Sequence, residues 1–295
     1  IDSRIAYLCA SKRMDWEPVA WTEFDGKNIV FTDIQKGPVM RVATYERGRL
    51  RFWTDPFEIN VSNEFHFFTP SDSVQDVTLF AKYTLRADDM FLNRMIGGTF
   101  EGSNDPDFRE KEVLYLINEK PKRLQTVVQS YSSKPYRYVR YIGPKDSHCN
   151  IAEAAFYTPN DTASLKGKVI GTSGCFQKDG SHEYTNVFDG DVTTSFDYVE
   201  PSGGWSGLDL GIPKQIGRII YTPRNYDNYV CHGDDYELFY CAKRGKWRSL
   251  GWQFAEKDSL VYKDVPHNVL LLLKNYSKGV QERIFTYDVG KQLWK

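Results

Sequence analysis

The chain has 295 residues, a length that corresponds to about two domains at a typical ~150 residues each. Its 38 Lys and Arg residues against 39 Asp and Glu residues give a formal charge of -1, which argues against a nucleic-acid binder because such proteins need a clustered basic surplus. No stretch approaches the ~18 to 20 consecutive apolar residues of a membrane span, so we expect no membrane insertion. Aromatic residues make up 15% of the chain, and this favours β-structure because rings fit half-buried pleated surfaces.

Short runs that alternate apolar and polar residues dominate the first 86 residues. We expect strands at 28–34, 37–43, 57–61 and 77–81, separated by turn residues such as those at 25–26 and 47–48. The first 85 residues contain no convincing helical periodicity. The pattern predicts a small antiparallel β-sandwich or barrel over 1–86, with Trp16, Trp21 and Trp53 in its core.

The rest of the chain contains an internal repeat. Residues 135–157 and 266–287 each read as a strand, a polar loop, a glutamate (Glu153 or Glu282) and a closing strand. The last copy also has a long N-terminal half, about 165–224, that the middle copy lacks. We therefore predict an all-β chain of tandem antiparallel β-sandwiches with boundaries at 1–86, 87–158 and 159–295.

Five short motifs follow one another in the last of these units. They are Asn186-Val-Phe-Asp-Gly-Asp191 with Thr194, Gly204-Trp-Ser-Gly-Leu-Asp-Leu-Gly211, Ile216-Gly-Arg-Ile-Ile-Tyr-Thr-Pro-Arg224, Tyr236-Glu-Leu-Phe-Tyr240, and Trp247 with Leu250-Gly251. Because it carries these five motifs in this order, the unit resembles the discoidin family, also called the coagulation factor five/eight type C or galactose-binding-like fold. The resemblance implies a complete discoidin-like jelly roll over 159–295. The middle unit resembles only the C-terminal half of that fold, because it has no "DGD…T" loop and no "DLG" strand.

The whole chain also resembles the C-terminal region of secreted bacterial proteins in which such modules follow a transglutaminase-like or other enzymatic domain. That resemblance implies an extracellular, cell-surface or periplasmic location. It also implies an N-terminal enzymatic domain as a partner within the full-length protein.

No catalytic set of residues assembles in the sequence. The chain contains no nucleophile-elbow, zinc-protease, phosphate-binding or dinucleotide-binding motif, and its five histidines stand singly. His148 and Cys149 are adjacent, and neighbours on a strand point to opposite faces, which makes a poor nucleophile and base pair. We expect a protein without enzymatic activity.

The loop around Asp189-Gly-Asp191 has two interpretations. The discoidin resemblance implies a structural calcium ion held by Asp189, Asp191 and Thr194, with Glu282 on the closing strand, since calcium takes 6 to 8 oxygen ligands. The alternative is an ordinary turn, in which Asp and Gly are favoured without any ion.

The loop that follows the "PR" strand carries the predicted ligand site. In sugar-binding members of the resembled family, an arginine and a following asparagine in this loop bind ring hydroxyls while an aromatic ring stacks below. The matching residues are Arg224 and Asn228, with Tyr229 or Tyr226 as the ring. A second loop at the same end offers Asp197, Tyr198 and Glu200. The alternative is a structural Arg224 paired with a carboxylate such as Asp209 or Asp234.

These patterns favour a non-catalytic region that binds carbohydrate through shallow, weak sites. The competing hypothesis is a structural spacer or docking scaffold for an N-terminal enzymatic domain, which the incomplete middle unit favours. The five cysteines include no closely spaced pair, so a structural zinc is not expected. Cys231 and Cys241 could bridge neighbouring strands or stay as buried thiols, and the sequence leaves both open.

Overall fold

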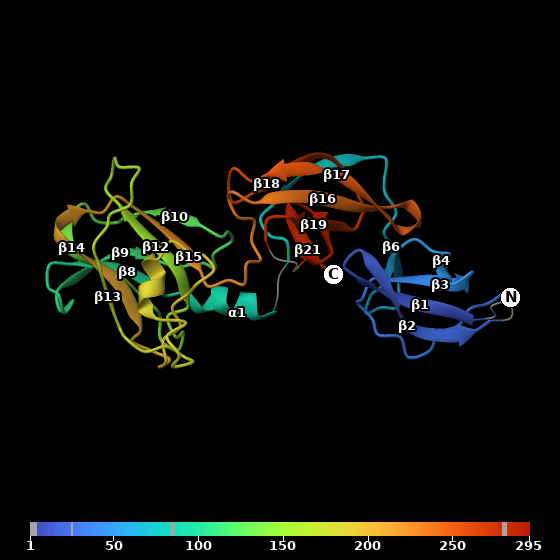
Figure 1. Cartoon of the computed structure of the whole chain (residues 1–295), viewed down its shortest axis with the longest axis horizontal. Coiled ribbons are helices and arrows are strands. Elements are labelled where there is room, and N and C mark those ends of the chain that lie inside the picture. The colour runs from blue at the N-terminus through green and yellow to red at the C-terminus, as the bar shows by residue number, and fades with distance from the viewer. Residues whose placement is uncertain (1–4, 25, 84–85, 279–281) are drawn as a thin grey trace. The chain divides into compact units, whose positions relative to one another are not determined.

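The structure is a computed structural model of the chain and describes residues 5–24, 26–83, 86–278 and 282–295 (Figure 1). It confirms the predicted all-β class, because antiparallel strands carry nearly all of the regular structure. The chain divides into two compact units. We call Leu85–Tyr229 the inserted unit, and Ile1–Thr84 with Val230–Lys295 the discontinuous unit.

The inserted unit is a sandwich of two antiparallel sheets. One sheet has five strands in the order β13-β14-β11-β8-β9 and the other has three in the order β10-β15-β12. The strands are β8 (Thr99–Ser103), β9 (Lys111–Leu116), β10 (Thr126–Gln129), β11 (Pro135–Ile142), β12 (Ile151–Tyr157), β13 (Lys168–Gly171), β14 (Trp205–Gln215) and β15 (Arg218–Pro223). The helix α1 (Arg86–Arg94) precedes them and the short 3-10 helix η1 (Tyr184–Phe188) lies before β14.

The inward-facing residues of both sheets form one core. Phe100 and Leu208 from the five-stranded sheet join Phe156 and Ile219 from the three-stranded sheet, all of them buried. In β12 the residues Ala154 and Phe156 are buried and Glu153, Ala155 and Tyr157 beside them are half-buried, as the period of two along a strand requires.

The boundary predicted at 158/159 differs from the observed one. β11 pairs with β14, so that Val139 faces Leu208, and β12 pairs with β15, so that Ala155 faces Ile220. Residues on both sides of position 158 therefore share both sheets. The loop and the "DLG" strand that the middle segment lacks are supplied by the first half of the following segment, and the five motifs of the discoidin resemblance are divided between the two units.

The discontinuous unit is built from both ends of the chain. Its first sheet has the order β2-β1-β3-β5-β6, with β4 paired to β3, and a five-stranded sheet has the order β17-β16-β19-β20-β21. Its strands are β1 (Ile5–Lys12), β2 (Asp15–Glu23), β3 (Met40–Glu46), β4 (Arg49–Phe52), β5 (Phe57–Ile59), β6 (Phe65–Phe67), β7 (Val74–Leu79), β16 (Asp235–Ala242), β17 (Lys246–Phe254), β18 (Leu260–Pro266), β19 (Leu271–Asn275), β20 (Phe285–Asp288) and β21 (Lys291–Trp294). The short 3-10 helix η2 (Lys243–Gly245) lies between β16 and β17.

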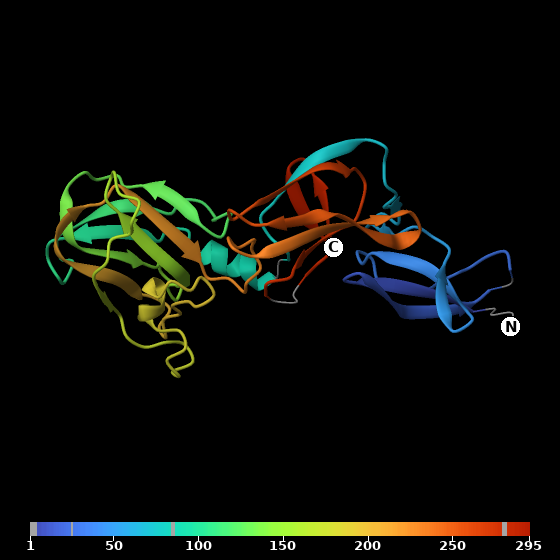
Figure 2. The same ribbon diagram turned by 45° about the horizontal axis from the view of Figure 1, so that its top comes forward.

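Strand pairing and shared cores join the two ends within this unit. β7 pairs with β18, and Figure 2 shows the cyan strand of residues 74–79 beside the orange strands from the other end of the chain. Val77 and Leu79 pack in one core with Leu238 and Leu271. The sequence predicted a separate unit over residues 1–86. These pairings and shared cores explain why those residues instead form one unit with the C-terminal part of the chain.

Other predictions made from the sequence for this region differ from the structure at single segments or residues. Residues 28–34 form no strand, although Phe31 and Ile34 pack on a small core beside β1. Trp16 is half-buried, but Trp21 and Trp53 are 66% and 58% exposed, so these two do not belong to the core. Cys231 and Cys241 are both buried thiols that form no disulfide in the structure. Among the described residues, no helix has the length and apolar character that crossing a membrane requires.

Candidate functional site

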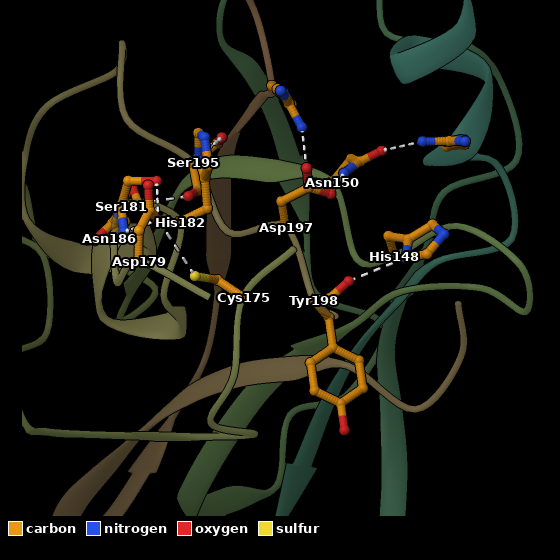
Figure 3. Close-up of polar contacts among 12 residues, drawn as sticks. His148, Asn150, Cys175, Asp179, Ser181, His182, Asn186, Ser195, Asp197 and Tyr198 are labelled. Atoms are coloured by element: carbon orange, nitrogen blue, oxygen red, sulfur yellow. Dashed lines mark hydrogen bonds and ion pairs between the residues drawn. The ribbon is translucent and has the colours of Figure 1, made fainter. Parts of the chain in front are cut away.

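Three loops meet at one end of the inserted unit, and they carry the residues for which the sequence predicted a ligand site. They are residues 143–150 after β11, 172–204 before β14, and 224–229 after β15. Backbone hydrogen bonds tie the second loop to the first and to the start of β12: Tyr198 N donates to His148 O at 2.7 Å, and Phe196 N donates to Ile151 O at 2.8 Å. The end of the sandwich is thus a fixed frame for side chains, shown in Figure 3.

A continuous polar chain crosses this end. The Nη1 atom of Arg224 donates to Oδ2 of Asp197, and Nδ2 of Asn150 donates to the other carboxylate oxygen. Figure 3 shows Asp197 and Asn150 pointing toward one another. Nη1 of Arg94, in α1, donates to Oδ1 of Asn150 at 3.0 Å. One carboxylate, one amide and two guanidinium groups therefore satisfy one another.

The Arg224–Asp197 pair is largely out of solvent. The side chain of Arg224 is 14% exposed and that of Asp197 is 8% exposed. This burial fits the alternative in which Arg224 is a structural residue paired with a carboxylate. The observed partner is Asp197, whereas the sequence predicted Asp209 or Asp234. Asp209 instead accepts two hydrogen bonds from Arg137, at 2.8 and 2.9 Å, and Asp234 lies in the discontinuous unit.

Aromatic rings cover the guanidinium of Arg224. Its Cζ atom lies 4.3 Å from the centroid of the Phe91 ring and 5.8 Å from that of Tyr226, distances at which cation–π attraction operates. The two rings are 5.7 Å apart and tilted by 55°. Tyr226 keeps 41% of its surface exposed, so it is the ring that a ligand can reach.

The loop after β15 is braced by its own asparagines. Oδ1 of Asn228 accepts from Tyr226 N at 3.3 Å, and Oδ1 of Asn225 accepts from Asp227 N at 3.0 Å. Asn228 and Tyr229 are only 3% and 6% exposed. Of the four ligand residues predicted in this loop, Tyr226 alone presents a large exposed surface.

The second predicted loop contributes unevenly. Glu200 is exposed, whereas Tyr198 is half-buried, with its ring centroid 6.0 Å from that of Phe196. Figure 3 shows the Tyr198 ring pointing away from Asp197. The structure therefore does not place this ring beside the Arg224 pair.

Sequence reasoning missed several residues at this end. Asn150, Arg94 and Phe91 complete the surroundings of Arg224 and Asp197, although Arg94 and Phe91 come from a helix that no periodicity predicted. Phe176 is 61% exposed, and its backbone N donates to Asp197 O at 2.8 Å. Nearby, Oγ of Ser195 lies 3.3 Å from Nδ1 of His182. No local motif marks any of them, since their contacts depend on the meeting of distant loops.

The adjacent His148 and Cys149 do not form a nucleophile and base. Cys149 is 1% exposed, and burial raises the pKa of its thiol to about 12. A thiol that stays protonated at neutral pH is a poor nucleophile. Nδ1 of His148 lies 3.0 Å from the carbonyl oxygen of Tyr198, which engages this nitrogen with the backbone.

The predicted calcium loop folds as a hydrogen-bonded turn. Oδ1 of Asp189 accepts from Asp191 N at 2.8 Å, and its Oδ2 accepts from Oγ1 of Thr194 at 2.9 Å. Gly190 N donates to Oε1 of Glu153 at 2.8 Å. Burial, together with a hydrogen bond to the Asp189 carboxylate, raises the pKa of Glu153 to about 8. The acidic side chain beside this loop is thus Glu153, from β12.

The four residues predicted to hold calcium are divided between the two units. Glu282 belongs to the discontinuous unit, whereas Asp189, Asp191 and Thr194 lie in the inserted unit. Across the described residues, no group of three or more His, Cys, Asp or Glu side chains is arranged to hold a metal ion. The geometry of the loop fits the turn interpretation, and calcium binding stays a prediction.

Comparisons with protein-family models, with curated proteins and with solved structures give no match for this chain. The discoidin resemblance therefore rests on the short motifs alone. The physical properties of the loop end carry the functional argument that follows.

Proposed function

We propose that the chain is a non-catalytic binding region that recognises carbohydrate at the loop end of the inserted unit. The observation that carries this proposal is the exposed Tyr226 ring beside the Arg224–Asp197 pair. A sugar offers an apolar C–H face and a rim of hydroxyl groups, so it needs a flat ring next to fixed polar atoms.

In this proposal the residues have different roles. Tyr226 is the stacking platform, and the exposed Glu200, with the small accessible part of Arg224, supplies polar contacts. Asp197 and Asn228 act as positioning residues, because one neutralises Arg224 and the other accepts a hydrogen bond from the backbone of Tyr226. Such a site is shallow and binds weakly, so repeated modules would raise the affinity through avidity.

The wider setting follows from the resemblance stated for the sequence. We propose a secreted bacterial protein in which this region follows an enzymatic domain, outside the cytoplasm. In that setting the binding region would hold the enzyme near glycans.

A glycan array on the full chain, followed by titration of the best binder, tests the proposal. Tyr226→Ala should weaken binding about fivefold or more, since the stacking of a nucleobase on one aromatic side chain, a comparable contact, contributes about 1–3 kcal/mol. Tyr276→Ala is the control, because Tyr276 is 50% exposed and lies in the discontinuous unit. Equal losses in both variants, or binding unaffected by Tyr226→Ala, would contradict the proposed site.

The burial of Arg224 and Asn228 favours a second candidate function. Arg224 is paired with Asp197 from a neighbouring loop, and Asn228 accepts a hydrogen bond within its own loop, as expected for a structural spacer or docking scaffold. An array with no glycan bound above background would favour this second function.

A further inference from the structure

A pocket of about 340 Å³ opens on another part of the inserted unit, at the connection between β9 and β10. It shares no residue with the site around Arg224. Its volume lies within the range of about 300–1,000 Å³ that is usual for small-molecule sites. The lining residues are Tyr115, Glu119, Lys120, Pro121, Lys122, Arg123, Gln125, Thr126, Val127 and Tyr221.

Two tyrosines form one wall of the pocket. The rings of Tyr115 and Tyr221 have centroids 6.5 Å apart, and Tyr221 is 2% exposed, so the core of the sandwich holds this ring in place. Burial raises the pKa of both phenols, that of Tyr221 to about 12. The buried Tyr221, whose hydroxyl group is hydrogen-bonded to Thr126, supports the wall from behind. The half-buried Tyr115 presents the aromatic carbon and the neutral hydroxyl group that a ligand can reach.

The rim of the pocket is positively charged. Three of its described lining residues, Lys120, Lys122 and Arg123, are cationic, and only Glu119 is anionic. Lys122 and Glu119 form an ion pair at 3.0 Å, but their side chains are 75% and 70% exposed. Water screens such a pair, so it holds Lys122 only weakly and an incoming anion can compete for it. The net positive lining is complementary to an anion.

We propose that this pocket binds a saccharide acid, that is, a sugar ring that carries a carboxylate. The carboxylate would lie at the rim between Lys122 and Arg123, since a guanidinium can donate two parallel hydrogen bonds to a carboxylate. The C–H face of the sugar ring would pack on the accessible part of the Tyr115 ring. This site is independent of the carbohydrate site proposed at Tyr226, because the two involve different loops.

Saturation-transfer NMR titrations of the full chain with D-glucuronate, D-glucose and inorganic sulfate test the proposal. Glucuronate should bind about tenfold more tightly than glucose, because only glucuronate has a charge for the rim. Arg123→Gln should weaken glucuronate binding about tenfold and Lys122→Gln about threefold. Higher ionic strength should weaken it further.

Lys168→Gln is the matched control. It removes one exposed positive charge from the same unit, on β13, at the opposite edge of the five-stranded sheet from β9. The control should bind glucuronate as the unmodified chain does, and a thermal melt checks that every variant is folded. Equal binding of glucose and glucuronate, or an equal loss in Lys168→Gln and Arg123→Gln, would overturn the proposal. Sulfate binding as tight as that of glucuronate would overturn the assignment of a saccharide.

Discussion

The carboxylate of Asp197 is paired with the guanidinium of Arg224, and the two side chains come from loops 27 residues apart in the sequence. Each has less than a sixth of its surface exposed. Both charges are compensated, because Asn150 supplies a second donor to Asp197 and the Phe91 ring covers Arg224. Removing either partner leaves the other as a buried charge, so we expect this pair to matter for folding.

Arg224→Met should lower the free energy of unfolding by about 3 kcal/mol, since breaking a buried ion pair leaves an uncompensated charge. Arg137→Met is the control: its pair with Asp209 is more exposed, at 43% and 21%, and its loss should cost about 1 kcal/mol or less. Urea unfolding measures both. The double variant Arg224→Met with Asp197→Leu should recover part of the loss. Equal costs for Arg224→Met and Arg137→Met would mean that Arg224 is not a structural residue.

Sequence reasoning identified strands well and their partners poorly. The alternation in 57–61 and 77–81 gave β5 and β7, because the period of two is a local property of a strand. The partner of a strand is not local. β7 pairs with β18 about 180 residues further along the chain, and no residue in either strand encodes that distance.

The same limit applies to the candidate site. The sequence could predict that Arg224 has a carboxylate partner, since buried arginines are normally paired. It could not identify that partner as Asp197, because the position of Asp197 depends on how two loops meet. The helix α1 was missed, since nine residues give too short a window for a helical period. Consequently Arg94 and Phe91 could not be assigned to the site in advance.

The division of the chain predicts which fragment folds by itself. A fragment of residues 85–229 contains both sheets of the inserted unit and should unfold cooperatively, with the circular dichroism of a β-protein. A fragment of residues 159–295 lacks β10, β11 and β12, which are the neighbours of β15 and β14 in the two sheets, and should stay unfolded. Cooperative unfolding of 159–295, with 85–229 unfolded, would restore the boundary expected from the sequence.

Two glycines test the contact between the ends of the chain in the discontinuous unit. Gly48 and Gly245 both have positive φ, at +78° and +68°. A Cβ at Gly48 meets nothing within 4 Å, whereas one at Gly245 would collide with Nη1 of the buried Arg41. Gly48→Ala should cost about 1 kcal/mol and Gly245→Ala about 3 kcal/mol in urea unfolding. Equal costs would contradict the packing of Arg41 against residue 245.

The five cysteines should be inert toward thiol reagents in the folded protein. All five are buried and none is in a disulfide, and burial raises the pKa of Cys149 and Cys241 to about 12 and that of Cys9 to about 11. Since the thiolate is the reactive form, a chromogenic disulfide reagent should label none at pH 8 and all five in denaturant. Fewer than five thiols in denaturant, under non-reducing conditions, would indicate a disulfide such as Cys231 to Cys241.

Glu153 should make stability depend on pH. Its pKa is about 8 in the folded chain against an ordinary 4.5, so folding favours the protonated form. The stabilisation is complete below about pH 4.5, and it is lost as the pH rises through 8. Glu153→Gln keeps an acceptor for Gly190 N and removes the charge beside Asp189. In chelator, this variant should therefore melt at a higher temperature than the unmodified chain at pH 9.

The same pair of proteins tests the calcium prediction. If the loop binds the ion, calcium should raise the melting temperature of the unmodified chain at pH 8 and should raise that of Glu153→Gln much less, since a carboxylate is a stronger calcium ligand than an amide. A melting temperature that is the same in chelator and in excess calcium would reject the ion. The titration of Glu153 must change the relative stability of the two proteins between pH 5 and pH 9. If their difference in melting temperature stays constant over that range, the raised pKa of Glu153 is contradicted.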